Sequence, residues 1–136
     1  IAFLSFMTEF VTSITEGVKV SVETYYYPEH SIPHNPEYVF AYRITIENRS
    51  PHTIQLLNRH WFIYDSFIRR EVKGAGVIGQ QPVLEPGESH QYISGCNLTT
   101  EIGKMFGAFT MTRVHDGSRF LVNIPAFLMV VPHKLN

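Results

Sequence analysis

Cysteine, one-sided charge and long apolar runs are all missing or scarce in this sequence, and each scarcity removes a class of protein. A single cysteine, Cys96, excludes an internal disulfide and any cysteine-rich zinc module, and it suits a reducing cytoplasm. No apolar run approaches the ~20 residues that a membrane helix requires, so membrane insertion is not expected. A net charge of only -1 with 44% hydrophobic residues argues against disorder and against general nucleic-acid binding. The composition indicates a cytoplasmic globular chain with one core.

The residues of nucleophilic catalysis are also sparse. Only two aspartates occur, Asp65 and Asp116, and no Gly-x-Ser-x-Gly motif is present. Cys96 is interpreted as a small buried thiol, because a catalytic thiolate would require a histidine close in space. The glutamates are scattered, so no pair is singled out for acid–base chemistry. The sequence therefore predicts a protein without catalytic residues.

The seven histidines do not form a recognisable metal motif. His30 and His34 lie four residues apart, as two ligands on one helical turn would, but Pro33 predicts a loop there. His60, beside the only tryptophan, is expected to form a hydrogen bond at the margin of a sheet. We predict neither a metal site nor a cofactor.

Apolar and polar residues alternate with a period of two from Val18 onward. Val18, Val20 and Val22 are separated by polar residues, as a strand with one buried face requires. Similar β-rich runs follow at residues 38–48, 53–57, 59–65, 69–72, 89–94, 106–114, 119–124 and 127–131. No long helix is expected, and parallel βαβ folds are excluded because their crossovers need helices. The predicted fold is all-β, a sandwich of two antiparallel sheets.

Turn residues agree with this fold. Asp116-Gly117 predicts a two-residue hairpin loop, and Pro86-Gly87 fits the central positions of a type II turn. The prolines are expected to fall outside strand interiors, where each would remove a ladder hydrogen bond.

The first 17 residues show no comparable pattern. Residues 1–6 are apolar but lack the features of a signal peptide, and Met7 is interpreted as the native start. Residues 8–16 are expected to form a turn of helix or a frayed strand. The sequence thus predicts an N-terminal segment, 1–17, followed by one β-sandwich domain, 18–136.

The segment from Gly74 to Gly79 matches the Gly-x-Gly-x-x-Gly fingerprint of dinucleotide-binding folds. The prolines that follow exclude the helix on which that fingerprint depends, so we interpret the segment as an unusual loop between strands. An alternative is an anion-binding nest of exposed amides, which would take phosphate, pyrophosphate or a nucleotide, with or without a metal. The residues of this hypothetical site are Lys73, Gly74, Gly76, Gly79 and Gln80.

The chain has more aromatic residues than a minimal core needs. Sandwich packing accounts for most of them, while Tyr26, Phe67 and Phe106 are the first candidates for an exposed interaction surface. The edge strands of a sandwich also offer a route to β-augmented complexes and homo-oligomers.

Several segments carry a family resemblance in their order and spacing. They are residues 18–24, 40–48, 55–61, 74–82, 86–88, 94–96, 103–107 and 124–127, and they include Arg59-His60-Trp61 and the Gly-x-Gly-x-x-Gly-x-Gln-Pro segment. Together they resemble the ApaG family. The family usually has Asp-x-x-Gly after the tryptophan strand, whereas this chain has Asp65-Ser66-Phe67-Ile68, so that turn should differ and expose Phe67.

The resemblance implies an immunoglobulin-like or fibronectin type III-like sandwich. It also implies a link to cobalt and magnesium tolerance in bacteria, and a role in protein interaction like that of similar domains in larger eukaryotic proteins. No catalytic residues come with it. The function expected is therefore non-catalytic binding of a protein partner of unknown identity, with the phosphate-binding loop as the alternative.

Overall fold

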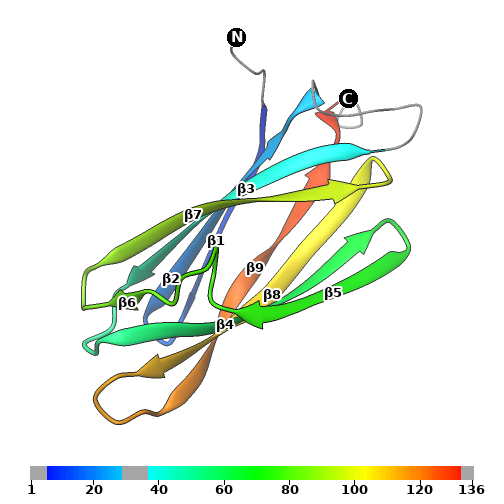
Figure 1. Ribbon diagram of the computed structural model, residues 1–136. Coiled ribbons are helices and arrows are strands. Elements are labelled where there is room, and N and C mark those ends of the chain that lie inside the picture. Colours follow the sequence, from blue (N-terminus) through cyan, green and yellow to red (C-terminus); the bar gives the residue numbers. More distant parts are fainter. Residues whose placement is uncertain (1–5, 29–36, 133–136) are drawn as a thin grey trace.

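The computed structural model, which describes residues 6–28 and 37–132, consists of two antiparallel β-sheets packed face to face (Figure 1). One sheet has the strand order β1-β2-β3-β7, and the other has the order β5-β4-β8-β9, with the short β6 paired to β4. The strands are β1 Phe6–Thr15, β2 Val18–Tyr26, β3 Tyr38–Asn48, β4 Ile54–Asp65, β5 Ile68–Ala75, β6 Val83–Leu84, β7 Ser89–Leu98, β8 Ile102–Arg113 and β9 Arg119–Val130. The predicted two-sheet sandwich is confirmed. In the part of the chain that the structure describes, no helix has the length and apolarity needed to cross a membrane.

The predicted alternation sets which residues form the core. Val18, Val20 and Val22 on β2 are fully buried, while the residues between them are partly exposed. Between the sheets, the ring of Tyr42 lies 5.4 Å from that of Trp61 and 5.6 Å from that of Phe127. Burial of these large rings supplies much of the hydrophobic stabilisation that holds the two layers together.

The N-terminal segment forms a strand, which is one of the two forms expected for residues 8–16. β1 pairs with β2 along its whole length, and the side chain of Val11 packs against the core. The sandwich therefore begins at Phe6 in the described residues, ahead of the predicted boundary at Val18. Its apolar residues Phe10 and Ile14 face outward, which weakens the alternation signal on which the sequence prediction relied.

Two strands each join two predicted runs, because an irregularity interrupts the pattern within the strand. β4 joins the predicted runs 53–57 and 59–65, with a register shift between Leu56 and Asn58. β9 joins 119–124 and 127–131 through Pro125, so the prediction that no proline lies within a strand is wrong. Pro125 is tolerated because β9 is an edge strand of its sheet and the register of its pairing with β8 shifts there.

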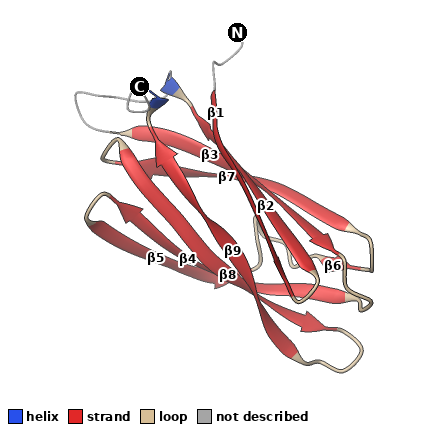
Figure 2. Ribbon diagram, turned by 180° about the vertical axis from the view of Figure 1, so that it is seen from behind, coloured by secondary structure: helices blue, strands red, loops and turns tan. Residues whose placement is uncertain are grey.

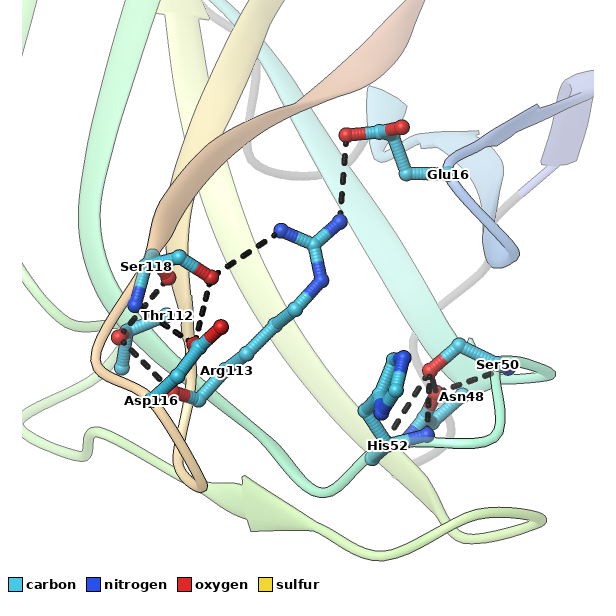
Figure 3. Close-up of polar contacts among 8 residues, drawn as sticks. All are labelled: Glu16, Asn48, Ser50, His52, Thr112, Arg113, Asp116 and Ser118. Atoms are coloured by element: carbon cyan, nitrogen blue, oxygen red, sulfur yellow. Dashed lines mark hydrogen bonds and ion pairs between the residues drawn. The ribbon is translucent and has the colours of Figure 1, made fainter.

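The β8–β9 connection and the neighbouring loops are held by a cluster of polar contacts (Figure 3). The predicted two-residue loop is instead a five-residue loop, 114–118, in which Gly117 has φ 71° and its amide donates to the carbonyl of Arg113. Arg113 reaches Glu16 at 3.3 Å, and the buried Asn48 amide donates to the carbonyls of His52 and Leu84. The Pro86-Gly87 turn is confirmed, with φ 89° at Gly87 and a hydrogen bond from Glu88 to Glu85.

The two long sides of the sandwich differ. On one side the edge strands β1 and β9 lie side by side (Figure 2). They are tied together because Ser13 donates to the carbonyl of Asn123 and Leu128 donates to the carboxylate of Glu9. On the other side, the edges are β5 and β7. There Arg70 spans the gap and donates to the carbonyl of Asn97 at 2.9 Å. We call this the open side.

Candidate functional site

Three aromatic rings stack on the outer face of the five-stranded sheet. Trp61, Ile63 and Asp65 point inward from β4, so Phe62 and Tyr64 point outward. Phe62 lies opposite Phe106 of β8 in the register, and their ring centroids are 5.3 Å apart at an interplanar angle of 20°. Tyr64 stacks on the same Phe106 ring at 6.0 Å. We call Phe62, Tyr64 and Phe106 the aromatic face.

Cations surround the aromatic face. The Arg69 guanidinium lies 4.8 Å from the centre of the Phe62 ring, and the Lys104 ammonium lies 5.5 Å from that of Phe106. Beside them, His60 forms the expected hydrogen bond, to Glu71 at 2.5 Å, although β4 is an inner strand of the sheet and not its margin. That hydrogen bond is the main cause that lowers the pKa of Glu71, opposed by partial burial and helped by Lys73.

A groove of about 420 Å³ borders the aromatic face. Its lining residues are Tyr64, Ser66, Ile102, Gly103, Lys104, Phe106 and Leu128. Ile102 and Leu128 are 52% and 47% exposed, so the groove has apolar side chains open to solvent. Phe67, the residue after Ser66, is fully exposed at the tip of the β4–β5 turn, as predicted. The groove and the turn together form an apolar surface beside the cations.

Asp65 holds this end of the sheet in place. It is 4% exposed, and its carboxylate accepts hydrogen bonds from the backbone amides and hydroxyls of both Thr99 and Thr100. Burial raises the pKa of Asp65, but these four hydrogen bonds outweigh burial and place the pKa below its ordinary value. The contact fixes the β4–β5 turn against the β7–β8 turn, which precedes the groove residue Ile102.

The structure brings together only part of the predicted interaction surface. Phe106 lies at the centre of the aromatic face and Phe67 is exposed nearby. Tyr26 is only 7% exposed and packs against Phe40 at 5.1 Å, so its assignment to an exposed surface is wrong. The reason is the parity of β2, whose even-numbered residues face the core. Phe62 and Tyr64 were missed, although the alternation in residues 59–65 carried the signal.

The amides of the glycine-rich loop are largely occupied. Gly76 donates to the carbonyl of Leu57 at 2.8 Å, and Val77 and Gln80 hydrogen-bond each other's backbone. Gly76 has φ 62°, and a Cβ there would lie 2.2 Å from the carbonyl oxygen of Gln80. Glycine is therefore required for local chain geometry, which supports the interpretation of the segment as a structural loop.

The proposed anion nest does not gather as a unit. Lys73 points to the outer face, where it lies 3.6 Å from Glu71, whereas Gly74 on the same strand faces the Arg59 guanidinium. Gly79 has φ 71° with open space around it. The side chain of Lys73 thus lies on the face of β5 opposite the one that meets the Arg59 guanidinium, and a phosphate site at this set of residues stays a prediction.

Neither the cysteine nor the histidines form a chemical centre in the described residues. Cys96 is a buried free thiol, as predicted, and burial raises its pKa, with a smaller opposing effect from Arg70. Within residues 6–28 and 37–132, no group of three or more His, Cys, Asp and Glu is arranged to hold a metal ion. His30 and His34 lie outside the described residues.

Comparisons with known proteins place the chain in a family. A family model described as the ApaG domain matches residues 28–113. Protein ApaG of Brucella canis is 46% identical over 124 residues, which cover 90% of this chain and 95% of that protein. Protein ApaG of Brucella anthropi is 48% identical over 124 residues, with 90% and 94% covered. The crystal structure of the putative ApaA protein from Bordetella pertussis superposes with a TM-score of 0.81 at 45% identity, covering 85% of this chain and 94% of that one. The chain belongs to the ApaG family.

Proposed function

We propose that this chain is a non-catalytic protein-interaction domain that binds its partner through the aromatic face. The observation that carries the proposal is the stack of Phe62, Tyr64 and Phe106 on the solvent side of a sheet. Aromatic side chains dominate the energetics of protein interfaces, because they bury a large area while losing few rotatable bonds. An apolar groove next to the stack provides a pocket for an anchoring side chain of the partner.

The charges around the aromatic face define the chemistry of the partner. Arg69 and Lys104 lie over the rings at its edge, so acidic residues on a partner would find complementary cations there. The partner surface that fits best is an apolar side chain flanked by aspartate or glutamate. We propose that any effect of this protein on cobalt or magnesium tolerance acts through that partner, and that the partner is a different protein in the cytoplasm.

Affinity purification with quantitative mass spectrometry tests the proposal. Phe106→Ala removes the central ring, and Lys104→Glu reverses an exposed charge without touching the core. Both should reduce recovery of the same stoichiometric partner at least fivefold. Loss of one anchoring ring or of one cation at an interface typically costs about 1–2 kcal/mol of binding, which is consistent with that reduction.

Ile93→Ala is the matched control. Ile93 is 62% exposed on β7, whereas Phe106 is partly exposed, so the truncation removes an apolar side chain that is at least as accessible from the other sheet. Recovery with this variant should equal that of the parent chain. If Phe106→Ala retains the partner and Ile93→Ala loses it, the interface lies on the four-stranded sheet. If only further copies of this chain are enriched, the chain forms a homo-oligomer instead.

A further inference from the structure

Two adjacent cavities lie between the sheets on the open side. Each has a volume of about 270 Å³. Both are lined by Tyr42, Arg59, Trp61 and Ser94, so they are parts of one cleft. Each alone is slightly smaller than a typical small-molecule site, about 300–1,000 Å³, and the two together fall within that range. We call them the inter-sheet cleft.

Arg59 is an arginine on the core-facing side of β4, and the glycine-rich loop fixes it there. Its Nη1 donates to the carbonyl oxygens of Ala75 and Gly76, both at 2.9 Å. Gly74 lies directly beneath the guanidinium, since a Cβ at this position would lie 2.8 Å from both Nη atoms. The loop therefore presents carbonyls to a cation, and the glycine at position 74 makes room for it.

The positive charge of the cleft has no carboxylate to balance it. The structure gives no protein partner, among the described residues, for the Nε–H and Nη2–H donors of Arg59. None of the described residues lining either cavity is an aspartate or a glutamate. Arg70 adds a second guanidinium, which donates to the carbonyl of Asn97. The Nε and Nη2 side of a guanidinium presents two parallel donors, which match a carboxylate or a phosphate.

Tyr92 supplies an independent observation. Its side chain lines the cleft and is 9% exposed, and its hydroxyl is buried without a hydrogen-bond partner among the described residues. Buried polar atoms without partners are rare in folded proteins and call for an explanation. Burial, and to a smaller extent Tyr42, raises the pKa of Tyr92 above its ordinary range, so the hydroxyl stays protonated and remains a donor.

We infer that the inter-sheet cleft binds a small organic anion, whose carboxylate or phosphate group pairs with Arg59 and accepts a hydrogen bond from Tyr92. The body of the ligand lies against the apolar and aromatic walls, where the rings of Tyr42 and Trp61 are 5.4 Å apart. This site is separate from the aromatic face and does not depend on the proposed protein partner. Carboxylate and phosphate share the same chemistry here, so the experiment distinguishes them.

Titration of the full chain with benzoate, phenyl phosphate and inorganic phosphate tests the inference, by calorimetry and by the NMR signal of the Trp61 indole. Trp61 is the only tryptophan and lines both cavities, so its signal reports occupancy of the cleft. Saturable binding of benzoate or phenyl phosphate at millimolar concentration, with a shift of the Trp61 signal, is the expected result. Whichever of the two binds more tightly identifies the anionic group.

Two variants and one control make the result specific. Arg59→Gln should weaken binding at least tenfold. Tyr92→Phe should weaken it at least threefold while leaving the melting temperature equal or higher, because the variant removes an unpartnered hydroxyl. Arg119→Gln makes the same charge change at an exposed residue on β9 and should leave the affinity within twofold.

Four outcomes would overturn the inference. They are no saturable binding of either organic anion, an unchanged affinity in Arg59→Gln, an unchanged affinity in Tyr92→Phe, and inorganic phosphate binding as tightly as phenyl phosphate. The last result would show that the aromatic walls contribute nothing to the affinity for the ligand. If Arg59→Gln fails to fold, Tyr92→Phe decides the question by itself.

Discussion

At the scale of single residues, buried polar groups and close backbone contacts determine the shape of the surface. Asp65 is buried and satisfied by four hydrogen bonds, and it positions the turn that exposes Phe67. Gly76 allows a carbonyl to approach where any side chain would collide. The sequence indicated that Gly76 belongs to an unusual glycine-rich loop between strands. It could not show which contact requires the glycine, because the partner Gln80 is close only after the loop has folded.

Asp65→Asn should destabilise the fold by about 2 kcal/mol or more at neutral pH, because a buried charged acceptor is replaced by an amide that cannot accept all four hydrogen bonds. The folded-state pKa of Asp65 is below the unfolded value of about 3.9, so its ionised form stabilises the fold above that pH. This contribution is lost as the pH falls through the folded-state pKa.

Urea unfolding of both proteins between neutral pH and about pH 3 measures this effect. The difference in unfolding free energy between the parent chain and Asp65→Asn should shrink as the pH falls below about 4. A difference that is small at neutral pH, or that stays constant with pH, would mean that the four hydrogen bonds do not stabilise the ionised carboxylate.

At the scale of strands, regular alternation of apolar and polar residues was sufficient to predict a strand. Where a bulge or a proline interrupts the alternation, the sequence did not predict the strand's full length. β2 and β3 alternate strictly; the start of β2 and both bounds of β3 were predicted as observed. β4 and β9 were each divided in two, at a register shift and at Pro125, because a bulge breaks the period of two without ending the pairing. The same alternation in β4 contained the aromatic face, but one sequence does not show which outward residues stack across strands.

β1 provides a test at this scale. Val11 lies opposite Val22 and packs on the core, whereas its neighbour Thr12 is exposed. Val11→Asp should therefore cost about 2 kcal/mol or more of stability, since it places an unpaired charge against the core, and Thr12→Asp should cost less than about 1 kcal/mol. Thermal unfolding of the two variants measures both effects. Equal and small losses would mean that β1 is not part of the cooperative fold.

At the scale of the whole molecule, the sides and faces of the sandwich differ in the residues that they expose. One long side is closed by contacts between β1 and β9, and the open side contains the inter-sheet cleft. The outer face of the five-stranded sheet has the stacked rings and their cations. Composition and strand pattern predicted the two-sheet fold. The functional surfaces depend on the packing of one sheet against the other and on the register between neighbouring strands, which are properties of the folded chain.

The most direct test of the account is site-specific photocrosslinking from the aromatic face. A benzophenone amino acid replaces Phe106 in one protein and Ile93 in another, and both are irradiated in cells. Replacement of Phe106 should yield a crosslink to one predominant protein, in which the crosslinked segment contains an apolar residue flanked by aspartate or glutamate. Replacement of Ile93 should yield none. Equal crosslinking from both positions, or crosslinking from Ile93 alone, would contradict the assignment of the aromatic face as the binding surface.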